Sequence, residues 1–294
     1  MHEKPKTISL VLGSGGARGM AHIGVIQVLE EHGLEIRSIS GSSIGALVGG
    51  IYAAGKIDDF VHWVCALERF DMLRLLDVSF SGKALFKGER IIATLKELIG
   101  DRNIEDLPIS FTAVATDLEA NREVWLSQGS LFEAIRASIA FPTVFAPFHE
   151  NGKKLVDGGL LNPIPIAPTL RDQTDLTIAV SLSGGAQIGP LEPEPVVPPQ
   201  VERNRYHRMV VEFIDGLQKK NNGVPEDESG FFDIISKSID VMQNTIASFK
   251  LAAYSPDLVV EIPKQTCTIY EFERATELIE VGRNEAEKAL AQIF

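Results

Sequence analysis

A pattern that occurs twice before residue 55 places the strongest constraint on the fold: a short apolar segment, a turn rich in glycine or serine, and an apolar helical segment. Residues 8–12 and 35–40 have the length and composition of buried strands, and residues 20–32 and 44–54 carry apolar side chains at helical spacing. Strands that alternate with helices form parallel sheets covered by helices. We therefore expect an α/β fold, a three-layer α/β/α sandwich with a mainly parallel central sheet.

The rest of the chain continues this alternation. Apolar runs predict strands at 109–116, 123–126, 155–156, 176–182 and 257–262, the last at an edge of the sheet. Helical spacing predicts helices over 130–137, 231–254 and 271–293. Gly33 and Gly55 are typical residues for ending the first two helices, and Ser130 is typical of a helix N-cap.

Residues 184–230 differ in composition from the segments on either side. Five prolines fall between residues 184 and 200, which is incompatible with regular structure there, and residues 203–219 have the spacing of an amphipathic helix. We expect one domain over 1–294, from which 184–230 departs as a proline- and glycine-rich and helical excursion. The helix is either a lid or membrane-contacting element, or it packs on the core or on another subunit.

Charge and cysteine content exclude several function classes. The chain carries a net charge of −12, whereas nucleic-acid-binding proteins present basic surfaces, so we expect no nucleic-acid partner. Cys65 and Cys267 lie far apart without metal-ligand spacing, so we expect two small buried side chains, no disulfide and no metal site. The apolar run near the N-terminus is too short for a signal peptide. We expect a cytoplasmic protein whose contact with membranes is peripheral.

The second turn places a serine in the setting of a catalytic nucleophile. Residues 41–45 read Gly-Ser-Ser-Ile-Gly, which matches Gly-x-Ser-x-Gly with Ser43 at its centre. In a nucleophile elbow, this pattern exposes a serine hydroxyl on a tight turn between a strand and a helix. The motif alone is common, but the strand and the helix that it requires are predicted on either side. The alternative is a tight turn with an unreactive serine.

The first turn, residues 13–19, offers a row of backbone N–H groups at a helix start, where negative charge is stabilised. A dinucleotide site is the rival interpretation, but Arg18 replaces the last glycine of Gly-x-Gly-x-x-Gly, and the Gly-Lys-Ser/Thr of a P-loop is absent. An oxyanion hole fits better, because successive glycines let N–H groups approach a developing alkoxide. Arg18 either adds positive potential or ties the loop down, and both roles stay open.

A serine nucleophile needs a base, and no histidine in the sequence stands in a pattern that marks one. The chain has six histidines, and each is better explained as structural or solvated. Asp157 follows the apolar strand at 155–156 and precedes two glycines that permit a sharp turn. We therefore take Asp157 as the candidate partner of Ser43, with an ordinary Asp-Gly turn as the alternative.

These motifs, in this order, resemble those of the patatin-like phospholipases, close to bacterial members related to the catalytic domain of neuropathy target esterase. That family carries a glycine-rich loop with a basic residue, then Gly-x-Ser-x-Gly, then Asp-Gly-Gly or Asp-Gly-Ala, and residues 15–19, 41–45 and 157–159 match them. A block at 137–147 matches as well, and the resemblance spans about residues 7–183 and 231–290. Ser14 departs from the family pattern, in which many members have glycine.

The resemblance implies the patatin-like fold and a serine esterase that releases fatty acid from phospholipid or lysophospholipid. It implies a dyad of Ser43 and Asp157, an acyl-enzyme on Ser43, and no cofactor or metal. It assigns the oxyanion hole to Gly15, Gly16, Ala17 and Arg18. Because an ordinary aspartate is a weak base for a serine hydroxyl, we expect proton removal to be concerted with attack and Asp157 to be partly desolvated.

Two other function classes compete with this interpretation. The first is a catalytically silent lipid-binding or regulatory module on the same fold, against which the intact serine and aspartate motifs speak. Absence of reaction with a fluorophosphonate probe would favour it. The second is a nucleotide-binding α/β protein, which Arg18 and the missing acidic partner for a ribose disfavour. Thermal stabilisation by a nucleotide would favour that class.

Overall fold

The computed structural model describes residues 6–67, 77, 86–185 and 228–293. Contacts divide the chain into a larger unit, 1–185 with 239–294, and a smaller unit, 186–238. The described part of the smaller unit is residues 228–238, where helix α8 begins. The predicted excursion at 184–230, with its helix at 203–219, therefore lies almost entirely outside the described residues and stays a prediction.

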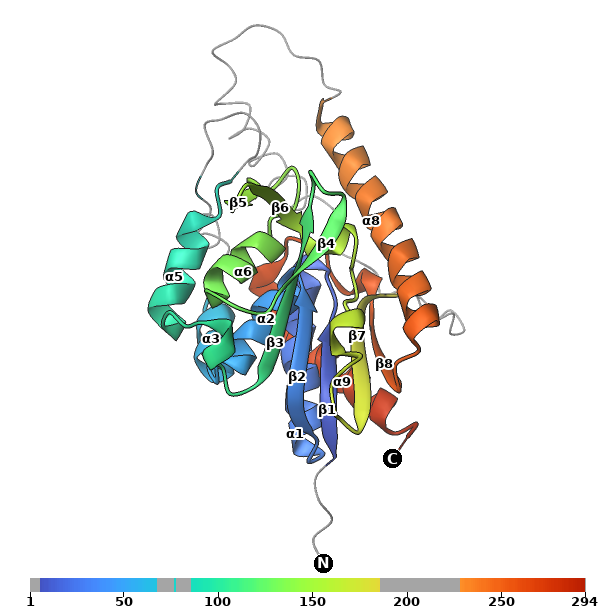
Figure 1. Cartoon of the computed structure of the whole chain (residues 1–294). Coiled ribbons are helices and arrows are strands. Elements are labelled where there is room, and N and C mark those ends of the chain that lie inside the picture. The colour runs from blue at the N-terminus through green and yellow to red at the C-terminus, as the bar shows by residue number, and fades with distance from the viewer. Residues whose placement is uncertain (1–5, 68–76, 78–85, 186–227, 294) are drawn as a thin grey trace, which may run out of the picture. The chain divides into compact units, whose positions relative to one another are not determined.

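The strands of the larger unit form one mixed sheet (Figure 1). They are β1 (Thr7–Leu12), β2 (Glu35–Ser42), β3 (Ser110–Asp117), β4 (Arg122–Leu126), β5 (Phe148–Glu150), β6 (Lys153–Asp157), β7 (Leu176–Gly184) and β8 (Leu258–Pro263). Their order is β5-β6-β3-β2-β1-β7-β8, with β4 paired to β3. The pairs among β3, β2, β1, β7 and β8 are parallel, whereas β4, β5 and β6 join in antiparallel pairs. The mainly parallel sheet is confirmed, with β8 at one edge.

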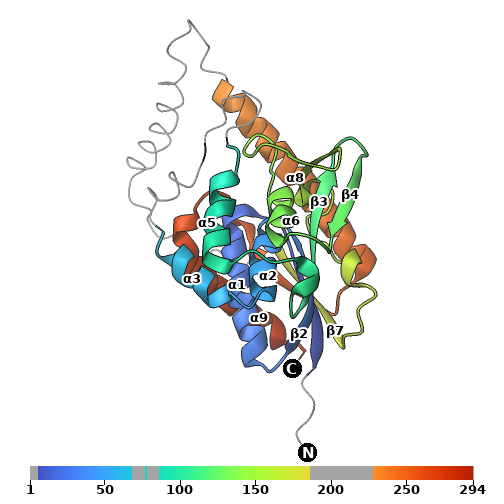
Figure 2. The same cartoon turned by 60° about the vertical axis from the view of Figure 1, so that its left-hand side comes forward.

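Helices cover both faces of this sheet. They are α1 (Ala21–Glu31), α2 (Ile44–Ala53), α3 (Ile57–Cys65), α5 (Glu89–Ile99), α6 (Leu131–Ser138), α8 (Glu228–Tyr254) and α9 (Ala275–Leu290). Figures 1 and 2 show α1, α2 and α9 on one side of the sheet and the C-terminal part of α8 on the other. The expected three-layer α/β/α sandwich is therefore confirmed.

The alternation of side chains along β1 explains how both layers attach. Leu10 and Leu12 belong to the main buried cluster, which α1, α2 and α9 complete. Val11, between them, points to the other face and joins a second cluster with Ala179 of β7 and Ala247 of α8. Successive residues of a strand face opposite sides of the sheet. β1, in which every residue after Thr7 is buried, is therefore covered on both faces.

The helix ends predicted from single residues are confirmed. After α1, Gly33 has φ 71°, and the N–H of Leu34 donates to the carbonyl oxygen of Leu29 at 3.0 Å, the bonding of a Schellman motif. Gly55 ends α2 with a φ of 69°. Ser130 caps α6, because its hydroxyl accepts a hydrogen bond from a backbone N–H in the first turn.

Two helices were missed and one helix begins later than expected. For the stretch that α3 and α5 occupy, no element was predicted. The β-branched and aromatic residues of α3 occur in strands as readily as in helices, whereas the buried residues of α5 recur at helical spacing, at Ile92, Leu95 and Ile99. The closing helix, expected over 271–293, starts at Ala275, after a short 3-10 turn at Phe272–Arg274. The described residues contain no helix that is both long enough and apolar enough to span a bilayer.

The expectation that both cysteines are buried is wrong for one of them. Cys65 is exposed, whereas Cys267 is buried. Cys65 is the last residue of α3, and that helix turns Phe60 and Val64 toward the core instead. An apolar side chain in the sequence is therefore not a reliable sign of burial at the end of an amphipathic helix.

Candidate active site

Ser43 lies on the turn between β2 and α2, as the Gly-x-Ser-x-Gly motif predicts. Its backbone has φ 56° and ψ −123°, a combination that residues other than glycine rarely adopt. The turn is pressed against β1, because a Cβ atom added at Gly45 would lie 2.1 Å from the carbonyl oxygen of Leu12. Ser43 is partly exposed between two buried neighbours. The strand, turn and helix of a nucleophile elbow are therefore present at residues 41–45.

Asp157 ends β6, and the sheet brings it beside the elbow. β6 pairs with β3, which itself lies next to β2. The hydroxyl of Ser43 donates a hydrogen bond to Oδ2 of Asp157 at 2.5 Å, across a sequence separation of 114 residues. The other carboxylate oxygen, Oδ1, accepts a hydrogen bond from the N–H of Gly159 at 2.7 Å. The two candidate residues are thus in direct contact, with no imidazole between them.

Burial gives the carboxyl group of Asp157 an unusual pKa. The residue is 1% exposed, and the penalty for burying a carboxylate raises its pKa to about 7. The hydrogen bonds from Ser43 and Gly159 act in the opposite sense, because they stabilise the charged form, but burial outweighs them. A proton acceptor with a pKa near 7 is better matched to general base catalysis at neutral pH than an ordinary aspartate.

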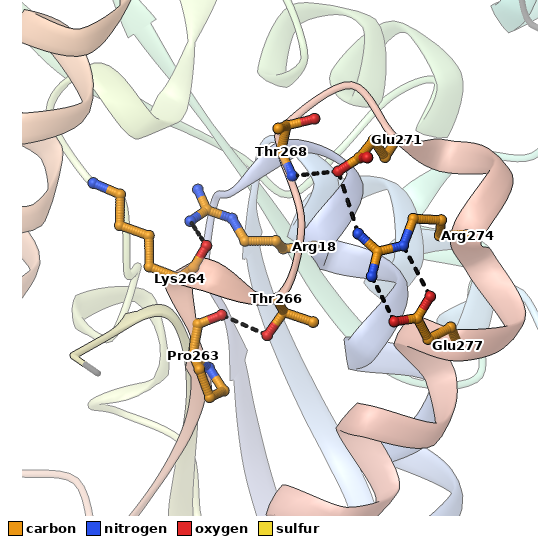
Figure 3. Close-up of polar contacts among 8 residues, drawn as sticks. All are labelled: Arg18, Pro263, Lys264, Thr266, Thr268, Glu271, Arg274 and Glu277. Atoms are coloured by element: carbon orange, nitrogen blue, oxygen red, sulfur yellow. Dashed lines mark hydrogen bonds and ion pairs between the residues drawn. The ribbon is translucent and has the colours of Figure 1, made fainter. Parts of the chain in front are cut away.

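The glycine-rich loop, residues 13–19, follows β1 and is held by Arg18. Nε of this buried side chain donates to the carbonyl oxygen of Gly15 at 3.2 Å. Nη1 donates to the carbonyl oxygen of Lys264 at 3.3 Å, as Figure 3 shows. Asp240 of α8 lies 3.9 Å from Nη2. Of the two roles left open for Arg18, tying the loop down is the one that these contacts perform.

Two further contacts hold the same loop. The N–H of Ala17 donates to the carbonyl oxygen of Ile269 at 3.0 Å. His22 of α1, which is fully buried, donates from Nε2 to the carbonyl oxygen of Gly13 at 2.9 Å. Burial lowers the pKa of His22 to about 4, so the ring is neutral at pH 7. The amides predicted to form the oxyanion hole are those of Gly15, Gly16, Ala17 and Arg18, and that role stays a prediction.

The segment between β8 and α9 supports the glycine-rich loop from outside. The carboxylate of Glu271 accepts hydrogen bonds from the N–H of Thr268 and from Arg274, which also pairs with Glu277 (Figure 3). The same segment supplies the two carbonyl oxygens that bind Ala17 and Arg18. Sequence analysis missed this support because backbone carbonyls leave no motif in a sequence.

A second residue that sequence analysis missed contacts the elbow directly. The N–H of Ser43 donates to Oγ of Ser138, at the end of α6, at 2.9 Å. The signal that could have found this contact was the block 137–147, which resembles the patatin-like pattern but carries no acid, base or nucleophile with an obvious role.

The remaining candidate ligands do not gather into a metal site. Among the residues that the structure describes, no three His, Cys, Asp or Glu side chains are grouped so that they could hold a metal ion. The described histidines other than His22 are exposed, namely His32, His62 and His149. His2 and His207 lie outside the described residues.

Comparison with known proteins places these features in a family. Residues 10–170 match the family model described as patatin-like phospholipase. An uncharacterised NTE family protein of Mycobacterium tuberculosis (strain H37Rv) is 40% identical, and the match covers 96% of this chain and 91% of that protein. The lysophospholipase NTE1 of Saccharomyces cerevisiae is 31% identical over 195 residues, which cover 64% of this chain and 11% of the yeast protein. The solved structure of VipD from Legionella pneumophila aligns with a TM-score of 0.49, 15% identity, and coverage of 99% of this chain and 67% of that one.

Proposed function

Because this chain belongs to the patatin-like phospholipase family, we propose that it is a serine acyl-ester hydrolase that releases fatty acid from phospholipid or lysophospholipid. The observation that carries the proposal is the 2.5 Å hydrogen bond from the hydroxyl of Ser43 to Oδ2 of Asp157. It joins a nucleophile on a strained turn to a carboxylate whose pKa burial raises to about 7.

The reaction that this geometry supports has two halves. Oγ of Ser43 attacks the ester carbonyl while its proton passes to Asp157, and the intermediate then expels the alcohol of the lipid, which takes that proton. The product is an acyl-enzyme on Ser43. Asp157 next removes a proton from water as the water attacks the acyl group, and Ser43 regains a proton as the fatty acid leaves. No charged side chain of the described residues is among the causes that set the pKa of Asp157.

Stabilisation of the negative oxygen is the part that the glycine-rich loop would supply. Preorganised N–H donors are worth about 3–4 kcal/mol each when one is removed from such a site. The candidates are the amides of Gly15, Gly16, Ala17 and Arg18. In this structure the Ala17 amide already donates to Ile269, so it contributes only if that hydrogen bond breaks when substrate binds.

The test is to remove each half of the dyad separately. Ser43→Ala and Asp157→Asn should each lower hydrolysis of a soluble short-chain ester by roughly 10³-fold or more, with circular dichroism unchanged. A fluorophosphonate probe should label the native protein and fail to label Ser43→Ala. Native protein that folds, resists the probe and releases no fatty acid from a lipid panel would instead support the catalytically silent lipid-binding module.

We also propose that the outer face of α8 contacts the phospholipid surface. Between Ile239 and Tyr254, every exposed residue of this helix is uncharged, in a chain with a net charge of −12. Val241, Met242 and Phe249 are 62%, 56% and 71% exposed there. An uncharged helix face that exposes large apolar side chains fits the interface of a bilayer, where carboxylates would be repelled by anionic lipid.

The inner face of the same helix reaches the candidate active site. Asp240 lies beside Arg18, and a Cβ atom added at Gly159 would come within 2.8 Å of Nε2 of Gln243. A lipid surface against the outer face would therefore lie about one helix diameter, roughly 10 Å, from the loop that carries Asp157. This placement supports peripheral membrane binding, which we propose for a cytoplasmic protein.

Vesicle assays test the membrane contact. The double variant Val241→Ser/Phe249→Ser should lose co-sedimentation with phosphatidylcholine vesicles and act on them at least about tenfold more slowly, with a much smaller change on the soluble ester. Leu170→Ser is the matched control, because Leu170 is 57% exposed but lies outside α8. If the double variant changes the molecular mass in solution and leaves vesicle binding intact, the face is an interface between copies and the proposal is wrong.

A further inference from the structure

The hydrogen bonding of the central sheet is interrupted where β2 leaves it. β2 and β3 run parallel and stay in register up to the pair Ser42 and Val114. At Ser43 the chain turns away, so its N–H group no longer faces a carbonyl of β3 directly. A buried backbone N–H without an acceptor is strongly disfavoured, and the elbow therefore needs a partner from elsewhere.

The hydroxyl of Ser138 fills this gap. It accepts a hydrogen bond from the N–H of Ser43 at 2.9 Å and donates one to the carbonyl oxygen of Val114 at 2.6 Å. A serine hydroxyl can donate and accept at the same time. The relay from Ser43 through Ser138 to Val114 thus replaces the direct bond that the parallel ladder would otherwise make. Ser138 is fully buried, so no bulk water competes for either bond.

The same short segment also holds the other half of the dyad. The N–H of Asp157 donates to the carbonyl oxygen of Ala140 at 3.0 Å, two residues after Ser138. The backbone amides of both Ser43 and Asp157 are therefore bound by residues 138 and 140. This segment therefore links the backbones of the two candidate reacting residues.

We propose that Ser138 is a positioning residue for the reaction, whose hydroxyl fixes the strained elbow so that the oxygen of Ser43 reaches Asp157. The inference rests on the proposed function, because it assigns a role within that site. It adds Ser138 to Ser43 and Asp157 as a third side chain on which the reaction depends, and Ser138 acts through the backbone N–H of Ser43.

Loss of the Ser138 hydroxyl should change the pKa of Asp157, which a merely structural role of Ser138 would leave unchanged. Without it, the N–H of Ser43 and the carbonyl of Val114 both lose the hydroxyl that joins them, and the elbow is free to relax from its φ of 56°. The hydrogen bond from Ser43 lowers the pKa of Asp157, against the larger effect of burial. Movement of Ser43 should therefore raise the pKa of Asp157 further. The other described group that affects this carboxyl, the N–H of Gly159, is not touched by the change.

The experiment compares Ser138→Ala with three references. Ser43→Ala shows the pKa of Asp157 when the hydrogen bond is gone, and Ser138→Thr keeps a hydroxyl. Ser130→Ala is the matched control, because it removes a serine hydroxyl from the other end of the same helix, where it caps α6. The pKa of Asp157 is read by carbon-13 NMR of aspartate-labelled protein, with the signal assigned by Asp157→Asn. The values of kcat and KM come from a soluble short-chain ester.

We expect Ser138→Ala to raise the pKa of Asp157 toward its value in Ser43→Ala and to lower kcat by roughly 10- to 100-fold, as for a small misplacement of reacting groups. The KM should stay within about threefold. Ser138→Thr should return both quantities toward those of the native protein, and Ser130→Ala should change neither. If Ser138→Ala does not fold, Ser138→Cys, whose thiol is a weaker hydrogen-bonding group, takes its place.

The inference is overturned if Ser138→Ala, or its replacement, leaves both the pKa of Asp157 and kcat at their native values. This outcome is distinct from failure of the proposed function. In that case Ser43→Ala would hydrolyse the ester as fast as the native protein, while the NMR titration would still report whether Ser138 holds Ser43 against Asp157.

Discussion

The glycine-rich loop and the elbow begin alike and are held in different ways. Each follows one of two neighbouring parallel strands, β1 and β2, and each leads into a helix that packs on the same face of the sheet. The loop is held by the long side chain of Arg18, which binds the carbonyl oxygen of Lys264, about 250 residues away in the sequence. The elbow is braced by close backbone approach to β1 and by one hydroxyl group.

The titratable groups at the two turns also differ, in the direction in which burial shifts their pKa values. His22, beneath the loop, has a pKa lowered to about 4, and Asp157, beside the elbow, has one raised to about 7. Burial is the main cause of both shifts, because it disfavours whichever form is charged. His22 therefore stays neutral across the neutral pH range, whereas Asp157 changes its protonation state there. The comparison teaches that burial can hold one titratable group in a single protonation state at neutral pH and bring another, Asp157, to the pH at which it titrates.

The largest expected effect comes from removing the group that titrates. Asp157→Asn should lower hydrolysis by roughly 10³-fold or more and yet make the protein more stable at pH 8. The folded state holds the proton of Asp157 up to about pH 7, whereas the unfolded chain releases it near 3.8, so native stability falls as pH rises through that window. Urea unfolding at pH 5 and pH 8 measures the difference. A variant that is less stable than the native protein at pH 8 would contradict the burial penalty.

The pH dependence of the rate sharpens the comparison. Because Asp157 must be ionised to accept a proton, kcat/KM for a soluble ester should rise about tenfold per pH unit up to about pH 7 and then level off. Activity at pH 5 should therefore be about 100-fold below the plateau. The same limb should appear in His22→Gln. A limb near pH 4 would show that Asp157 titrates as an exposed aspartate does.

Loosening the loop should have a smaller effect. Arg18→Gln removes the buried guanidinium that binds the carbonyls of Gly15 and Lys264, so we expect a loss of about 1–3 kcal/mol in unfolding free energy and about tenfold in kcat. Arg274→Gln is the matched control in the supporting segment, because its ion pairs are partly exposed and worth at most about 1 kcal/mol. Equal loss of kcat in both variants would show that the segment acts as a whole rather than through Arg18.

The smallest effect on activity should come from His22→Gln, which keeps an N–H donor for Gly13 but cannot titrate. The unfolded chain gains a proton at His22 near pH 6.5 and the folded protein only near pH 4, so this residue lowers native stability as pH falls through that window. The variant should lose less stability than the native protein between pH 6.5 and 4, with kcat within about threefold. A steeper loss of stability at acid pH would contradict the neutral state of His22.

Local sequence patterns were enough to predict most of the helices and strands. The strand of residues 8–12, the helix stops at Gly33 and Gly55 and the cap at Ser130 were all predicted, since each depends on neighbours within a few positions. α3 and α5 were missed. The composition of α3 does not separate helix from strand, whereas the apolar residues of α5 do recur at helical spacing. The order of the strands, with β6 next to β3, has no local signal at all.

The sequence by itself determined the two turns, at 13–19 and 41–45, because a glycine- and serine-rich segment between an apolar strand and a helix permits few backbone conformations. Only the tertiary structure decided that Asp157 meets Ser43 across 114 residues, that Ser138 binds the elbow, and that Ile269 and Lys264 bind the loop. Those contacts depend on how the sheet and its helices pack. A pKa follows from them too, since burial in the folded protein, and not the type of residue, moves the proton affinity of Asp157 to the neutral range.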